Sequence, residues 1–283
     1  MNAMGEFRGT ERTRQVLLDA HVHLRSCFDG GLFFDSAAAN FQAAAGRLGL
    51  PPDTTGCLLL AECRGDVEFE RIRDEAHRFV NGRWTIHASQ DGCTLLGSCE
   101  GAVRLAVVAG RQIETRDGLE VLALACTARI QDRMGIDETI EAANEHGALA
   151  VLPWGVGKWR LRRGAIIRRL IETKNRGVLF IGDNGGRMAW MPRPRLLKRA
   201  QDLGFITLPG TDPLPLAGHA RRPGLYGCAL EIPPGAQELT GNIKQAVRRL
   251  QHQPPVFGRL ESVLGFCTSQ LALRMPRASA ATC

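Results

Sequence analysis

Two histidines separated by a single residue are the clearest chemical feature of this sequence. His21 and His23 follow the apolar segment Val16–Leu18, and Asp19 stands two positions before His21. Alternate residues of an extended strand point to the same side, so both imidazoles can face one metal ion. An isolated His-x-His pair is equally compatible with one ring bonding a loop carbonyl. The pattern therefore predicts a metal site only if further ligands are brought to it.

Three glycine-containing loops carry the other candidate residues. Residues 153–159, 182–187 and 210–215 each follow an apolar segment. Glycine, asparagine, aspartate and proline are also ordinary turn residues, so each loop alone indicates little. Placed after consecutive strands of one barrel, however, the three loops would share a pocket. The side chains expected in that pocket are Lys158, Asp183, Asn184, Arg187 and Asp212.

The roles of these residues follow from their chemistry. We expect Lys158 and Arg187 to hold an anion such as phosphate or carboxylate. We expect Asp212 to act as a base or as a metal ligand, because a carboxylate serves either purpose. Asp212, Lys158 and Arg187 are thus the candidate catalytic residues.

Short apolar segments alternate with helical patterns along most of the chain, which is typical of repeated βα units. Seven segments are expected to be strands: 16–18, 57–61, 105–108, 121–125, 148–152, 178–181 and 205–208. Amphipathic stretches between them are expected to be helices: 37–48, 67–79, one beginning at Asp137, 164–173 and 195–203. The pattern predicts an α/β fold, a distorted TIM-like (β/α)7–8 barrel with its site at the carboxyl ends of the strands.

Two regions depart from this alternation. Residues 83–100 contain the pair Asp91-Gly92 between alternating segments, which predicts a β-hairpin inserted into the barrel. Residues 237–275 are expected to form C-terminal helices, one of them over 256–273. We expect residues 1–283 to form one domain, because α/β barrels commonly reach this length.

Composition narrows the class of protein. Hydrophobic residues make up 44% of the chain and charged residues 23%, which is ordinary for a globular domain. The sequence shows no secretory signal and no apolar run of about 18 residues, so we expect a soluble, cytoplasmic protein without a membrane partner.

The net charge of +7 indicates what kind of molecule the protein could bind. Part of it is concentrated in residues 158–169, where such a basic run is either a solvated face or a site for a small anionic substrate. Nucleic acid is disfavoured as a partner, because the chain has one tyrosine and no basic stretch interleaved with aromatic residues.

The segment from Asp19 to His23, followed by Ser26-Cys27-Phe28-Asp29-Gly30, resembles the opening of the polymerase and histidinol phosphatase (PHP) family. That family has an Asp-x-His-x-His strand before a loop with Ser and Asp-Gly. Similar segments follow at 58–63, 110–124, 147–153 and 210–212, so the resemblance runs from about residue 17 to residue 227. It implies a PHP-type, amidohydrolase-like barrel that acts as a metal-dependent hydrolase, a phosphoesterase in particular.

Four positions depart from the ligand pattern of that family. Cys63 stands where the family has histidine, Gln112 where it has glutamate, Trp154 where it has histidine, and Leu214 where it has the closing histidine. The resemblance therefore implies that the usual cluster of two or three metal ions is incomplete in this chain.

The positions that match the family's ligands are those of His21, His23 and Asp212, and Asp29 is a further candidate. These matches imply a site for a single metal ion. One of three acidic residues, Glu62, Glu114 or Asp183, is expected to help these ligands hold the ion. Zinc or manganese accepts such mixed nitrogen and oxygen ligands, and an open coordination position would activate water.

Three functions are compatible with these patterns. The leading hypothesis is a metal-dependent hydrolase of PHP type that acts on a phosphoester or another small anionic substrate. The alternative is a catalytically silent PHP-like barrel that binds an anionic ligand or a partner protein through the face of Lys158 and Arg187. The third is a nucleic-acid accessory protein, which the excess of basic residues suggests. Its affinity for nucleic acid would fall steeply as the salt concentration rises.

Overall fold

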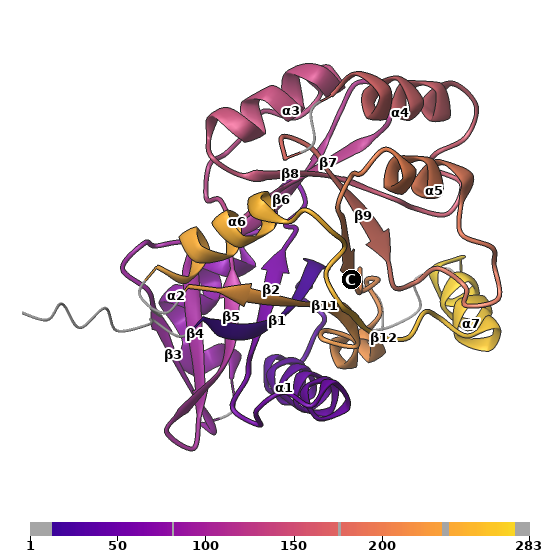
Figure 1. Ribbon diagram of the computed structural model, residues 1–283. Helices are drawn as coiled ribbons and strands as arrows, with labels where there is room; N and C mark the ends of the chain where they lie inside the picture. The colour runs from indigo at the N-terminus through magenta and orange to yellow at the C-terminus, as the bar shows by residue number, and fades with distance from the viewer. Residues whose placement is uncertain (1–12, 81, 175–176, 234–237, 275–283) are drawn as a thin grey trace, which may run out of the picture.

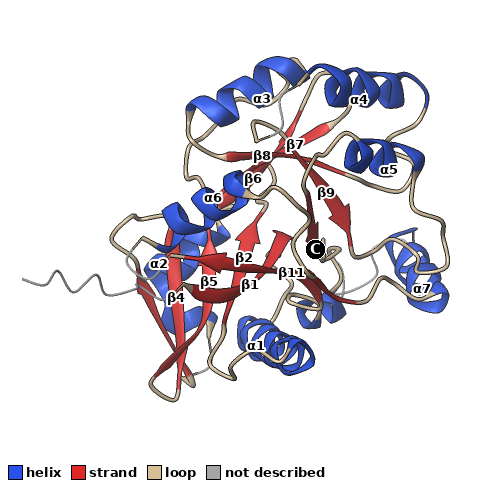
Figure 2. Cartoon of the chain, in the orientation of Figure 1, coloured by secondary structure: helices blue, strands red, loops and turns tan. Residues whose placement is uncertain are grey.

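The computed structural model describes residues 13–80, 82–174, 177–233 and 238–274. Within these ranges the chain forms two β-sheets, one of seven strands and one of five. Helices pack around both sheets (Figure 1, Figure 2).

Three parallel strands form the centre of the seven-stranded sheet: β1 (Arg14–Val22), β2 (Thr55–Leu60) and β5 (Ala102–Val108). Antiparallel strands extend it on both sides: β11 (Tyr226–Ile232) and β12 (Val256–Gly258) beyond β1, and β4 (Thr94–Cys99) and β3 (Trp84–Ala88) beyond β5. The pair β3 and β4 is the hairpin predicted around Asp91-Gly92, and it forms one end of this sheet.

The five-stranded sheet has the order β10, β9, β8, β7, β6. Its strands are β6 (Gly110–Glu114), β7 (Glu120–Leu124), β8 (Leu149–Pro153), β9 (Phe180–Asn184) and β10 (Thr207–Gly210). The strands β8, β9 and β10 are parallel to one another, whereas β6 and β7 are antiparallel to their neighbours. The two sheets are in contact where β1 meets β10 and where β2 meets β6.

The prediction of a TIM-like barrel is wrong. The seven predicted strands are present, but they are divided between two sheets, and the strands form no closed barrel in the described ranges. One reason is that residues 115–119 join β6 to β7 and Glu100-Gly101 join β4 to β5, and neither connection has room for the crossover helix that parallel pairing requires. The sequence also does not predict β6, β11 or β12, and β12 lies at the start of the helix predicted over 256–273.

Seven α-helices and one 3-10 helix lie in the described ranges: α1 (Gly30–Leu48), α2 (Glu68–Phe79), α3 (Ile136–Glu145), α4 (Leu161–Thr173), α5 (Arg195–Asp202), η1 (Ala217–Arg221), α6 (Leu239–Arg249) and α7 (Val263–Arg274). The longest, α1, begins after Asp29, whose carboxylate accepts a hydrogen bond from the Leu32 N–H, and ends at Gly49, which has a φ of 67°. Among the described residues, no helix combines the length and the apolar character that a bilayer crossing requires.

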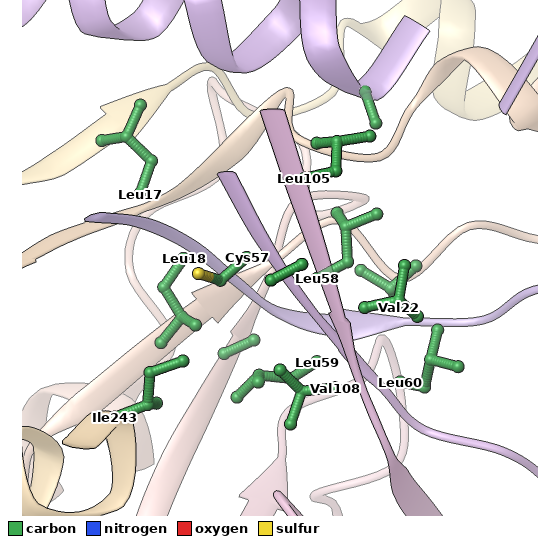
Figure 3. Close-up of a cluster of buried hydrophobic side chains, with 14 of the residues drawn as sticks. Leu17, Leu18, Val22, Cys57, Leu58, Leu59, Leu60, Leu105, Val108 and Ile243 are labelled. Atoms are coloured by element: carbon green, nitrogen blue, oxygen red, sulfur yellow. The ribbon is translucent and has the colours of Figure 1, made fainter. Parts of the chain in front are cut away.

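The larger hydrophobic core surrounds the central strands of the seven-stranded sheet (Figure 3). Leu17 and Leu18 of β1 and Leu58 and Leu59 of β2 are all 0% exposed. Successive strand residues point to opposite faces, so both faces of these strands are buried. Burial on both faces explains why these strands appear in the sequence as continuous apolar runs.

A second core lies between the five-stranded sheet and the helices α3, α4 and α5, which Figure 1 shows along one side of that sheet. Ile140 of α3, Ile167 and Leu170 of α4, and Leu197 of α5 are 0% exposed. Helices on this side hold β8, β9 and β10 in place and leave the residues after their carboxyl ends free to form a site.

The two sheets meet where the loop after β10 passes the end of β1. The Asp212 N–H donates a hydrogen bond to the His21 carbonyl at 2.8 Å. The approach is close because Gly210 has no side chain: a Cβ at that position would lie 2.3 Å from the His21 nitrogen. This contact decides where Asp212 lies relative to β1.

Candidate metal centre

Three ligand atoms from distant parts of the sequence converge at this junction. The Nε2 atoms of His21 and His23 lie 3.0 Å apart, and Asp212 Oδ1 lies 3.6 Å from the first and 3.2 Å from the second. Ligand atoms that hold an ion at about 2.0–2.1 Å are roughly 2.8–3.4 Å apart in octahedral or tetrahedral geometry, so two of the three separations fall in this range and the third is slightly longer. These three residues, which we call the metal cluster, therefore fit one divalent ion.

His21 belongs to strand β1, and His23 is the first residue after the strand. His21 and His23 are 5% and 3% exposed, and their rings meet edge to face with centroids 4.9 Å apart. Val22 between them is 0% exposed and belongs to the hydrophobic core. The alternation continues through the end of β1, so the two rings face each other, as predicted.

Asp212 is held in an unusual backbone conformation. Its φ of 47° lies in the left-handed region, which few residues other than glycine adopt. Asn184, at the end of β9, donates a hydrogen bond from its amide to Asp212 Oδ2, so that Oδ1 remains directed at the two histidines. Strain of this kind is often found at functional sites.

Asp19 ties β1 to the loop that carries Asp212. Its buried carboxylate accepts hydrogen bonds from the Thr211 N–H at 2.9 Å, the Thr211 hydroxyl at 2.7 Å and the Gly224 N–H at 2.9 Å. Burial raises the pKa of Asp19 to about 7, although these hydrogen bonds oppose the rise. Because Thr211 directly precedes Asp212, the bonds between Asp19 and Thr211 hold the backbone that carries Asp212.

Cys63 lies behind the ring of His23, and its Sγ is 3.8 Å from Nδ1. When Nε2 of a histidine binds a metal ion, Nδ1 carries the ring proton and usually donates it to an acceptor. Cys63 is in position to be that acceptor. The same sulfur lies 3.5 Å from Arg25 Nη1 and 4.0 Å from Gln112 Nε2.

The two rings of the metal cluster differ in protonation. Burial lowers the pKa of His21 to about 4. Burial also opposes a charge on His23, but hydrogen bonds with Asp212 and Cys63 outweigh it and raise the pKa of His23 to about 9. Burial would raise the pKa of Asp212, and the two rings outweigh it and hold that pKa below its usual range. Burial thus opposes a charge on all three groups, and the attraction between the carboxylate and the rings opposes the effect of burial.

A cavity of about 470 Å³ opens beside the metal cluster and is bordered by all three of its residues. Lys158 and Asn184 line the same cavity, so three of the five residues expected to share a pocket do so. Lys158 Nζ lies 2.5 Å from both carboxylate oxygens of Glu120. Gly155 permits this position, because a Cβ there would lie 2.8 Å from Lys158 Cδ.

Two of the three arginines that line the cavity, Arg25 and Arg222, are paired with acidic residues. Arg25 forms an ion pair with Asp66 at 3.3 Å, and Arg222 forms one with Glu261. Burial lowers the pKa of Arg222. The cavity therefore combines the metal cluster with several cations, which suits an anionic ligand.

Asp183 and Arg187 do not line the cavity; they pair with each other. Arg187 Nε and Nη2 donate to the two Asp183 oxygens at 3.0 and 2.9 Å, and the Tyr226 hydroxyl donates to Asp183 Oδ2 at 3.0 Å. Both side chains are almost fully buried. We call Asp183 and Arg187 the β9 ion pair, since Asp183 belongs to β9.

The other candidate ligands also lie apart from the metal cluster. Glu62 Oε1 accepts the Phe69 N–H at 2.8 Å and so caps the first turn of α2, and burial raises the pKa of this carboxyl. Glu114 is exposed at the end of β6, and Asp29 caps α1. Within the described ranges, the metal cluster is the one group of histidine, cysteine and acidic residues whose ligand atoms converge.

The positions where the family resemblance implies further ligands are at the same site. Gln112, Trp154 and Leu214 line the cavity, and Cys63 lies behind His23. Their side chains supply an amide, an indole and an isobutyl group, and the Cys63 thiol lies outside the group of converging ligand atoms.

Some residues of the site carry a weak signal in the sequence and others carry none. Asp19 stands two residues before His21 in the same strand, so strand alternation alone would have suggested that it accompanies the histidines. Arg222 has no such signal, because tertiary packing alone brings it to the cavity.

Comparisons with known proteins give a structural likeness and no match in sequence. No protein-family model and no curated protein matches this chain. One similar solved structure is PsfC from Pseudomonas syringae PB-5123, with a TM-score of 0.50 and 15% identity over 92% of this chain and 98% of that chain. The likeness shows a shared fold.

Two other similar structures are of endonuclease Q. The lesion-specific endonuclease PfuEndoQ from Pyrococcus furiosus has a TM-score of 0.46 and 12% identity, over 83% of this chain and 56% of that chain. The second is the complex of endonuclease Q with a 27-mer duplex substrate that has an abasic lesion at the active site. Its TM-score is 0.43 and its identity 12%, over 95% of this chain and 69% of that chain. Both likenesses are too low to bear on the partner of this chain, so the expectation that nucleic acid is disfavoured stays a prediction.

Proposed function

We propose that this chain is a metal-dependent hydrolase of PHP type that acts on a phosphoester or another small anionic substrate. The observation that carries the proposal is the convergence of His21, His23 and Asp212 at the wall of a cavity that Lys158 and Arg222 also line. Two imidazole nitrogens and one carboxylate oxygen suit zinc or manganese.

A divalent ion held there would act as a Lewis acid and would lower the pKa of a water molecule. The side chains around it bind and orient the substrate. Lys158 and Arg222 attract its anionic group, and Asn184 keeps the Asp212 carboxylate turned toward the histidines. A carboxylate whose pKa is below its usual range is a weak base near neutral pH, so we assign Asp212 to metal binding ahead of proton transfer.

The test is to measure bound metal and phosphatase activity in the purified full-length chain. We expect about one zinc or manganese ion per chain and hydrolysis of 4-nitrophenyl phosphate. His21→Ala and His23→Ala should lose both, whereas His87→Ala, which changes an exposed histidine of β3, should keep both. Unchanged activity in the two ligand variants would remove the proposal.

A second candidate function is a catalytically silent PHP-like protein that binds an anionic ligand or a partner protein. The observation that favours it is that Cys63, Gln112, Trp154 and Leu214 stand where the resemblance implies metal ligands. In this case phosphate should stabilise the metal-free protein against heat, and Lys158→Gln should abolish that stabilisation. Stabilisation that requires zinc or manganese would favour the hydrolase instead.

A further inference from the structure

Helix α7 forms a wall of the cavity that the metal cluster does not use. Phe266, Gln270 and Arg274 line the cavity. These residues are spaced by four, so they share one side of the helix. Leu264 and Leu271 lie elsewhere on α7 and are 75% and 58% exposed. The helix therefore turns an aromatic and polar side, which we call the α7 face (Phe266, Gln270 and Arg274), toward the cavity.

Three polar contacts fix this orientation. The hydroxyl of Ser269, a residue that is 9% exposed, lies 3.2 Å from Nε2 of His219. Just before the helix, Glu261 pairs with Arg222, and its N–H donates to the Gly185 carbonyl at 3.0 Å. Figure 1 shows α7 at the edge of the molecule, apart from α3 and α4. Its place beside the cavity therefore depends on these contacts and not on burial in a helical layer.

Arg274 differs from the other cations that line the cavity. Arg25, Lys158 and Arg222 each have a carboxylate partner. No carboxylate of the described part of the chain forms an ion pair with Arg274. An acidic group of a ligand in the cavity would provide the missing partner.

Phe266 and Gln270 add two further kinds of contact. The ring of Phe266 offers an aromatic surface to a planar group, and Trp154 borders the same cavity. The amide of Gln270 donates and accepts hydrogen bonds. A cavity of about 470 Å³ has room for a group of this kind beyond a phosphate at the metal cluster.

We propose that the α7 face binds the leaving group of the substrate, and that the substrate is an aromatic phosphate monoester whose ring carries a second acidic group. Phe266 packs on the ring, Gln270 bonds to its substituents and Arg274 pairs with the acidic group. The inference rests on the proposed function, because it places the phosphate at the metal cluster.

The test compares three phosphonates that the enzyme cannot hydrolyse: methylphosphonate, phenylphosphonate and 4-carboxyphenylphosphonate. Each is titrated by calorimetry into the full-length protein loaded with zinc or manganese. The aromatic ring should strengthen binding roughly tenfold over the methyl group. The carboxylate should strengthen it roughly tenfold again.

Variants assign each gain to a side chain. Arg274→Gln should remove the gain from the carboxylate and leave phenylphosphonate binding unchanged. Phe266→Ala should remove the gain from the ring, and Phe266→Leu, which keeps most of the apolar volume, should retain part of it. Leu271→Ala changes an exposed residue of the same helix and should bind all three phosphonates as the wild type does.

The possible outcomes separate this inference from the proposed function. Methylphosphonate reports on the metal cluster alone. If it binds and the two aromatic phosphonates bind no tighter, or if Arg274→Gln weakens all three equally, the inference about α7 is overturned and the proposed function stands. If none of the three binds to the metal-loaded wild type, both are overturned.

Discussion

The metal cluster and the β9 ion pair are both polar and mostly buried, and Asp212 follows β10 whereas Asp183 belongs to the neighbouring strand β9, but their atoms are used in different ways. In the β9 ion pair, both oxygens of Asp183 are occupied by Arg187, and Tyr226 adds a third hydrogen bond. In the metal cluster, three ligand atoms are aimed at one point beside a cavity.

This difference separates a residue that stabilises the protein from one that is available for chemistry. A buried carboxylate whose oxygens are all engaged cannot bind a metal ion without breaking those bonds. Asp212 has one oxygen held by Asn184 and the other directed at the histidines. Two aspartates at the ends of neighbouring strands thus have different roles because their partners differ.

The largest expected effect comes from removing a ligand of the metal cluster. Asp212→Asn keeps the shape of the side chain and weakens metal binding, so the rate of 4-nitrophenyl phosphate hydrolysis should fall on the order of 10³-fold, since the ion contributes several kcal/mol. Metal content and rate are measured together. A normal rate with normal metal content would contradict the assignment of Asp212.

Breaking the β9 ion pair should affect stability and spare metal binding. Arg187→Met leaves the Asp183 carboxylate buried without its main partner, and the free energy of unfolding should fall by about 3 kcal/mol. Tyr226→Phe removes one hydrogen bond and should cost about 1 kcal/mol. Urea unfolding measures both values, and a loss of bound metal from the folded Arg187→Met protein would show that the two clusters are not independent.

Cys63 tests how far the metal cluster depends on its surroundings, because its thiol contacts His23 but is not one of the three converging ligands. Cys63→Ala removes the acceptor behind His23 and should weaken metal affinity about 10–100-fold, as measured by competition with a chelator. Cys57→Ala removes a fully buried thiol of β2 and is the matched control, expected to leave that affinity unchanged. Equal effects of the two substitutions would argue against a role for Cys63.

The smallest expected effect is a change in the pH dependence of stability. Burial, together with the charge of Arg222, lowers the pKa of His219 from 6.5 to about 4. Between these pH values the unfolded state binds more protons than the folded state, so stability falls as the pH drops from 6.5 toward 4. His219→Gln should make this fall shallower in urea unfolding at pH 5 and pH 7, and an unchanged slope would contradict the prediction.

Strand β1 and the glycine-containing loops show how much of the site could be predicted. The apolar residues of β1 and its alternating histidines predict a strand with two rings on one side, because strand periodicity is a local property. The positions of Lys158, Asn184 and Asp212 after strands predict a shared cavity, and they line one. The prediction of a barrel was wrong because the order of the strands depends on which strands pair with each other. That pairing is not a local property of the sequence.

The sequence by itself determined which chemistry is available: two imidazoles on one strand, carboxylates and amides after other strands, and an excess of basic side chains. Only the tertiary structure decided which of them meet. Asp212 reaches the histidines because Gly210 lets its loop approach β1 closely, whereas Asp183 is turned to Arg187 four residues later in the chain. Such choices depend on contacts between segments far apart in sequence, and no local pattern encodes the distance between them.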